Sequence, residues 1–282
     1  MSDKKSLLPV KSDFVFKMIF GDQRNADILA EFLKSVLDIP EDEYEHITVI
    51  DPHIKKESLD DKYGILDVKV HTKNGQIVHV EIQVEPIPDM KERIVYDQSK
   101  LITEQISSGQ EWAVIKRTVT IVITDYIFVP ENEKYHNQFR YRTIDGTEFT
   151  ALTEINTLEL AKLPPAADSS ELWYWMKFIK SENNEEDIDM LAERNPQMKK
   201  AVGVLKELSA DERTRMLQEE REISRRDFVS RMNGAKREGR NERTIEIAKK
   251  MIKRGDSLSD IVFLLGLSLG EIEKIKESLL NI

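Results

Sequence analysis

The chain contains no cysteine among its 282 residues, which excludes a disulfide framework, a thiolate metal site and a cysteine nucleophile. It also lacks a glycine-rich phosphate loop, a nucleophilic-serine elbow and zinc-finger spacing. No apolar stretch is long enough to span a membrane, and the N-terminus lacks the apolar core of a signal peptide. We therefore expect a cytoplasmic protein without a membrane segment.

The net charge of -10 argues against non-specific coating of nucleic acid, because phosphate binding depends on Lys and Arg. The charge is unevenly distributed, however. Residues 221–254 hold 12 Lys or Arg against 5 Asp or Glu, which leaves -17 for the rest of the chain. This basic segment can contact DNA, although a solvent-exposed helix of mixed charge explains it equally well.

The hydrophobic pattern predicts an α/β fold, a mixed sheet flanked by helices, with an all-α tail. The expected helices and strands are, in order, a helix at 12–38, a strand at 47–54, a hairpin at 65–85, a helix at 90–108, strands at 119–124 and 138–143, and a helix at 171–180. Trp112, Trp173 and Trp175 are expected in the core. The predicted parts are a main domain at 1–180, a charged helical linker region at 181–233 and a small helical domain at 234–282.

The hairpin has an apolar face and a polar face. The polar face carries Asp67, Lys69, His71, His79, Glu81, Gln83 and Glu85. A two-residue Asn74-Gly75 turn would place Asp67 and Glu81 on opposite faces of the sheet. A three-residue loop with a left-handed Gly75 would instead place them directly across from each other, with Cβ atoms about 5 Å apart. The sequence permits both.

An Asp and a Glu on neighbouring strands provide the oxygen ligands that Mg²⁺ prefers, and such a site suits metal-dependent phosphodiester cleavage. Gln83 would position the water or the phosphate, and Arg93 on the following helix is a candidate for phosphate binding. The alternative is an ordinary solvent-exposed sheet face, which the spacing alone favours. The two histidines make a weak zinc site, since exposed histidines are the commoner case.

In the tail, Gly266-Leu267-Ser268 predicts a turn and a serine N-cap between two helices, as in a helix-turn-helix. Reading of DNA by the second helix is disfavoured, because phosphates would repel its acidic residues Glu271, Glu273 and Glu277. The alternative is a packing or dimerisation module, and we expect a homo-oligomer formed through these helices. Gly234 and Gly239 predict a basic connector before the tail.

Several motifs, taken in order, resemble one family. They are KSDFVFKMIFGD at 11–22, DDKYGILDVKV with Asp67, EIQ at 81–83, RIVYDQSKL at 93–101 and LLGLSLGEIEKI at 264–275. This series is similar to the recombination-promoting nuclease (Rpn) family, which is transposase-like and belongs to the PD-(D/E)xK nuclease superfamily. The resemblance implies a PD-(D/E)xK nuclease-like domain at 1–180 and covers the tail more loosely.

The resemblance makes Asp67 and Glu81 the metal ligands and places Gln83 where the superfamily usually has its catalytic lysine. Lys69, on the same face as Asp67, is our own candidate for a displaced positive charge. The family implies DNA as substrate, Mg²⁺ (or Mn²⁺) as cofactor, and endonuclease activity of low sequence specificity linked to recombination or phage defence. Two alternatives stay open: a catalytically weak DNA-binding or regulatory protein acting through the helical tail, and an interaction scaffold with a degenerate nuclease fold.

Overall fold

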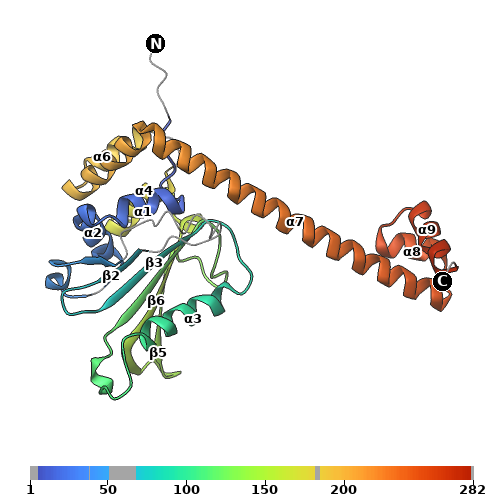
Figure 1. Ribbon diagram of the computed structural model, residues 1–282, viewed down its shortest axis with the longest axis horizontal. Helices are drawn as coiled ribbons and strands as arrows, with labels where there is room; N and C mark the ends of the chain where they lie inside the picture. Colours follow the sequence, from blue (N-terminus) through green and yellow to red (C-terminus); the bar gives the residue numbers. More distant parts are fainter. Residues whose placement is uncertain (1–5, 38, 51–67, 182–184, 281–282) are drawn as a thin grey trace, which may run out of the picture. The chain divides into compact units, whose positions relative to one another are not determined.

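The computed structural model describes residues 6–37, 39–50, 68–181 and 185–280. The chain divides into two compact units, Met1–Glu219 and Glu220–Ile282. The first unit is built on a six-stranded sheet in the order β1-β2-β3-β4-β6-β5, in which β3, β4 and β6 are parallel and the other neighbours antiparallel (Figure 1). The predicted mixed sheet is confirmed. Its strands are β1 (Thr48–Ile50), β2 (Val68–His71), β3 (Ile77–Gln83), β4 (Thr118–Thr124), β5 (His136–Arg142) and β6 (Glu148–Glu159).

Helices cover both faces of this sheet (Figure 1). The main hydrophobic core lies between one face and the helices α1 (Asp13–Phe20), α2 (Ala26–Val36), α4 (Glu171–Lys180), α5 (Glu185–Ala192) and α6 (Pro196–Ala210). On the other face, α3 (Met90–Thr103) packs Met90 and Ile94 against Val122 of β4. Because both faces are covered, β4 is buried along its whole length, as expected for a central parallel strand.

The single helix predicted over 12–38 is wrong, because α1 ends at Phe20 and α2 begins only at Ala26. The break lies at Gly21. A Cβ atom there would lie 2.7 Å from the carbonyl oxygen of Lys17 and 3.3 Å from Cγ2 of Val68, so the chain can approach β2 only with glycine at this point. Asp22 then starts a short 3₁₀ turn by accepting a hydrogen bond from the backbone N–H of Arg24 at 2.9 Å.

The β2–β3 hairpin has the three-residue loop and not the two-residue turn. The backbone N–H of Thr72 donates to the carbonyl of Gln76 at 3.0 Å, and Gly75 is left-handed with φ +80. Val68 consequently pairs with Val80 and Lys69 with His79. This is the register that the metal-site hypothesis requires.

Two of the three tryptophans lie where the sequence predicts. Trp173 and Trp175 of α4 are buried, and Trp175 packs on Phe20 and Phe32. Trp112, in contrast, is 80% exposed, so its prediction as a core residue is wrong. It lies in a short 3₁₀ turn, Trp112–Val114, between α3 and β4, where no element of the described chain covers it.

The second unit contains most of α7 (Glu212–Arg254), followed by α8 (Leu258–Leu265) and α9 (Leu269–Leu280). The predicted connector at Gly234 and Gly239 is wrong, because α7 continues through both residues. An isolated glycine costs a helix only about 1 kcal/mol relative to alanine, and the surrounding Arg, Lys and Glu are good helix formers. The three-part division at 180 and 233 stays a prediction.

The end of the tail folds as the sequence predicts. Gly266, with φ +64, ends α8, and Ser268 caps α9 by accepting a hydrogen bond from the backbone N–H of Glu271. The Glu271 carboxylate accepts from the backbone N–H of Ser268 at 2.8 Å, which completes a capping box. A small core of Ala248, Met251, Ile261 and Ile272 holds the three helices together. None of the described helices is long and apolar enough to cross a membrane.

Candidate functional site

Glu81 is the centre of the candidate site. It lies on β3 beside Val122 of β4, on the sheet face that α3 covers, and only 1% of its side chain is exposed. His79, two residues earlier on the same face, is also buried. The interpretation of this face as solvent-exposed, and of His79 as an exposed histidine, is therefore wrong. A carboxylate held out of water in this way needs compensating charge or hydrogen bonds.

Arg93, in the first turns of α3, provides positive charge at this carboxylate. Its Nη2 lies 3.5 Å from Oε1 of Glu81, and its Nε lies 3.4 Å from Oδ2 of Asp97, one helical turn further on. The Arg93 side chain is 36% exposed. The guanidinium thus faces Glu81 through Nη2 and Asp97 through Nε, while part of the side chain remains accessible to solvent.

The neighbouring Tyr126 responds to the negative charge of Glu81. Burial, and to a lesser extent the charge of Glu81, raise the pKa of Tyr126 to about 12. Its hydroxyl is buried and has no hydrogen-bond partner within the described part of the chain. Tyr126 is thus a neutral phenol at physiological pH. It follows β4 at the carboxyl end of the sheet, which is the position that could have marked it in the sequence.

Gln83 and Lys69 share the face of Glu81 but lie nearer to solvent. Gln83 is two residues beyond Glu81 on β3, and its Nε2 donates to the carbonyl of Glu85 at 3.1 Å, which leaves the amide a second N–H. Lys69 pairs with His79 across the hairpin, and its Nζ lies 3.7 Å from Oε2 of Glu104, just after α3. The structure brings Lys69, Glu81 and Gln83 to one face, with Arg93 above it.

Asp67 lies outside the described residues. Its neighbour Val68 pairs with Val80, in the register derived above. Among the described residues there is no group of three or more His, Asp or Glu placed to hold a metal ion. Of the two predicted ligands, Glu81 is the one that the structure describes, and its carboxylate offers the oxygen donors that divalent cations such as Mg²⁺ take.

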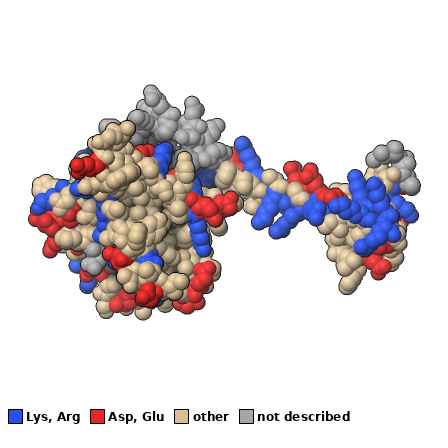
Figure 2. All heavy atoms as spheres, turned by 90° about the horizontal axis from the view of Figure 1, so that it is seen from below, with Lys and Arg blue, Asp and Glu red and all other residues tan. Residues whose placement is uncertain are grey.

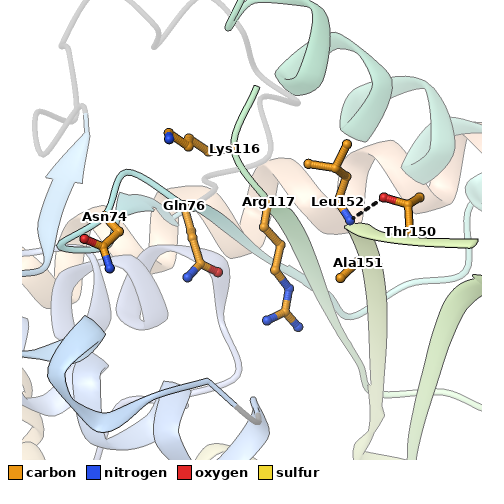
Figure 3. A pocket seen from close by; sticks show the side chains of 7 residues that line it. All are labelled: Asn74, Gln76, Lys116, Arg117, Thr150, Ala151 and Leu152. Atoms are coloured by element: carbon orange, nitrogen blue, oxygen red, sulfur yellow. Dashed lines mark hydrogen bonds between the residues drawn. The ribbon is translucent and has the colours of Figure 1, made fainter. Parts of the chain in front are cut away.

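A second polar region lies at the opposite end of the central strands. A hollow of about 380 Å³ is lined by Asn74, Gln76, Lys116, Arg117, Thr150, Ala151 and Leu152 (Figure 3). Arg117 donates to the buried Glu154 at 2.7 Å, and Arg140 donates to the same carboxylate at 2.6 Å. Burial acts to raise the pKa of Glu154, but the hydrogen bond from Asn156 and the two arginines outweigh it and hold the pKa below the ordinary value. These contacts tie β4, β5 and β6 together.

The fold, a mixed sheet with helices on both faces and a buried acid on a central strand, is the α/β architecture of a PD-(D/E)xK-like protein. Residues 10–235 match the model of the PD-(D/E)XK nuclease family transposases. The chain belongs to this family, and its function is of the nuclease or transposase type. Comparison with curated proteins and with solved structures gives no match.

Proposed function

We propose that this chain is a metal-dependent DNA endonuclease whose Mg²⁺ or Mn²⁺ is held by Asp67 and Glu81. The observation that carries the proposal is the hairpin register, in which Val68 pairs with Val80 around a left-handed Gly75. The same register continued by one residue would put Asp67 opposite Glu81, on adjacent strands and with side chains on the same face. The alternative turn would have separated the two acids.

The residues present fit a hard divalent cation. Glu81 offers carboxylate oxygens in a site shielded from bulk water, and its nearest described cation is the partly exposed Arg93. When bound, such an ion lowers the pKa of a coordinated water and neutralises charge on the phosphate. We propose that the side chains of the protein orient the DNA substrate and place positive charge near its phosphate.

Arg93 and Gln83 are the residues that we assign to the substrate. The Arg93 guanidinium can donate hydrogen bonds to a non-bridging phosphate oxygen, where the developing negative charge of the transition state is greatest. The second N–H of Gln83 can orient the attacking water or the phosphate. Gln83 carries no charge, so Arg93, and Lys69 at the edge of the face, are our candidates for the role that a lysine would have there.

We infer low sequence specificity for this activity, together with a link to recombination or phage defence. The described part of the first unit contains no helix or loop that we can assign to reading base edges, and an endonuclease of this kind would bind the phosphate backbone. A homo-oligomer formed through the C-terminal helices stays a prediction.

The test is cleavage of supercoiled plasmid by purified protein with Mg²⁺ or Mn²⁺. We expect Asp67→Asn and Glu81→Gln, which remove charge at nearly constant volume, to abolish cleavage, and Glu148→Gln on β6 to retain it. The Glu148 control lies at the exposed end of the β5–β6 hairpin. Equal cleavage by the wild type and both acid variants would reject the site, and cleavage unaffected by removal of divalent metal would reject the proposed cofactor.

A further inference from the structure

One face of α7 carries cations that have no acidic partner. Ser230, Asn233, Arg237 and Arg240 follow one another at spacings of three and four residues, which places them in a row along the helix, with Lys236 beside them. Together these five residues line a groove of about 450 Å³. All five are exposed, and Figure 2 shows Lys and Arg side chains gathered along this helix.

Several other basic residues of α7 have acidic partners. Arg226 pairs with Glu222, Arg243 and Lys250 pair with Glu246, and Arg254 pairs with Asp256. Within the described residues, Lys236, Arg237 and Arg240 have no carboxylate in ion-pair contact. The sequence explains why: the positions three and four residues before and after each of them hold only Asn, Gly, Met, Thr, Lys or Arg.

These unpaired charges also repel one another. Lys236 and Arg240 are four residues apart, and Arg237 and Arg240 are three apart, so both pairs are neighbours on the helix surface. If these positions served only the stability of the helix, we would expect an acidic residue among them, as Glu246 lies between Arg243 and Lys250. A polyanion bound along the face would remove the repulsion and release its own counterions.

We propose that this α7 basic face, defined by Ser230, Asn233, Lys236, Arg237 and Arg240, binds the phosphate backbone of double-stranded DNA. The choice of DNA rests on the proposed nuclease function. At 1.5 Å per residue the face extends about 15 Å, the axial length of roughly four phosphates of one strand. Ser and Asn side chains are suited to donate hydrogen bonds to phosphate oxygens beside the arginines.

The proposal assigns DNA contact to α7 and not to α9 of the helix-turn-helix-like tail. The exposed residues of α9 include Glu271, Glu273 and Glu277 against Lys274 and Lys276, so its surface is acidic on balance and less suited to phosphates. A row of cations with no base-reading element predicts binding that depends strongly on salt and weakly on sequence. Such a surface would hold the substrate of an otherwise acidic protein without selecting the cleavage position.

The experiment measures affinity of the full-length chain for a labelled DNA duplex over a series of salt concentrations, with divalent metal removed so that no cleavage occurs. The variant is Arg237→Gln with Arg240→Gln. We expect its affinity to fall about tenfold or more at moderate salt, and the slope of log K against log salt to decrease by about 2, because two phosphate contacts are lost. The loss should be the same for unrelated duplex sequences.

The matched control, Arg231→Gln with Lys253→Gln, removes the same charge from the same helix. These residues lie about 120° or more around the helix from Arg237 and Arg240, at 100° per residue. We expect the control to keep the wild-type slope. An unchanged slope in the Arg237–Arg240 variant, or equal losses in both variants, would overturn the proposal. The proposal would also be overturned if the Arg237–Arg240 substitutions weakened the binding of poly-glutamate but left the binding of DNA unchanged.

The outcomes separate this proposal from the proposed function. If the wild type cleaves plasmid but the Arg237–Arg240 variant binds DNA as well as the wild type, the α7 basic face is wrong and the nuclease site stands. If the variant loses DNA binding but the wild type shows no metal-dependent cleavage, the face is right and the endonuclease proposal fails.

Discussion

The guanidinium of Arg93 lies 3.5 Å from the buried carboxylate of Glu81 and joins helix α3 to the central strand β3. This contact places a permanent positive charge next to a negative charge that is almost fully removed from solvent. It also explains how a site with the uncharged Gln83 in the strand can still provide electrostatic stabilisation, since an arginine from the covering helix reaches the same place.

Replacement of Arg93 by alanine should lower the rate constant of DNA cleavage by about 10²-fold, because a donor aimed at the developing phosphate charge is lost. Arg93→Lys should recover part of that loss. The measurement is single-turnover cleavage of plasmid at saturating protein. Arg142→Ala is the control, since Arg142 is an exposed arginine on the edge strand β5, 4.0 Å from Glu148. A cleavage rate that drops equally in both variants would speak against a specific role of Arg93.

The charge of Glu81 should be detectable through Tyr126. We expect Glu81→Gln to lower the pKa of Tyr126 from about 12, while burial, the larger cause, keeps it above the ordinary value of 10.0. Alkaline titration of ¹³C-labelled tyrosine resolved by NMR, with Tyr126→Phe to assign the signal, measures this shift. The same pKa in the wild type and in Glu81→Gln would show that the two side chains do not interact.

The sequence predicts the hairpin and its two faces because alternation acts within a few residues, but it permits two registers. Gly75 is compatible with a left-handed conformation in either turn, and only the structure shows that the three-residue loop and its register are the ones formed. Local alternation cannot show what covers the polar face. That information lies in the next helix, whose buried residues Met90, Ile94, Gln98 and Leu101 recur every three or four positions and bring α3 down over Glu81.

Glycine has opposite effects at two positions of this chain. Gly75→Ala should lower the free energy of unfolding by about 1 kcal/mol, because φ +80 is unfavourable for a residue with a Cβ atom, although the nearest side-chain atom leaves room for one. Gly234→Ala in the middle of α7 should instead stabilise its helix by about 1 kcal/mol. Urea unfolding of both variants, followed by helical circular dichroism, measures the two signs. Destabilisation by Gly234→Ala would contradict a continuous α7.

The prediction of a connector at Gly234 and Gly239 failed for a related physical reason. Glycine marks a chain break only where the local structure needs its conformational freedom, as at Gly75 and Gly266, or the space left by its missing Cβ atom, as at Gly21. In α7 the glycines have ordinary helical geometry, and the flanking charged residues maintain the helix. Composition alone does not distinguish these cases.

The Glu154 carboxylate should make stability depend on acid pH. Its folded-state pKa is lowered, so the stabilisation is present above the unfolded-state pKa, near 4.5, and is lost as the pH falls through the lower folded-state value. Glu154→Gln leaves Arg117 and Arg140 without their shared acid and should cost about 3 kcal/mol at neutral pH. Urea unfolding between pH 7 and pH 3 measures both effects. An acid limb of equal steepness in the variant would contradict this assignment.

Binding of a divalent ion tests the central claim most directly, because it needs neither DNA nor turnover. Isothermal titration of Mn²⁺ into the wild type, Asp67→Asn, Glu81→Gln and the Glu148→Gln control compares the affinities on folded protein. We expect both acid variants to lose affinity by at least about tenfold, and the control to match the wild type. Equal Mn²⁺ affinity in all four proteins would contradict a metal site shared by Asp67 and Glu81.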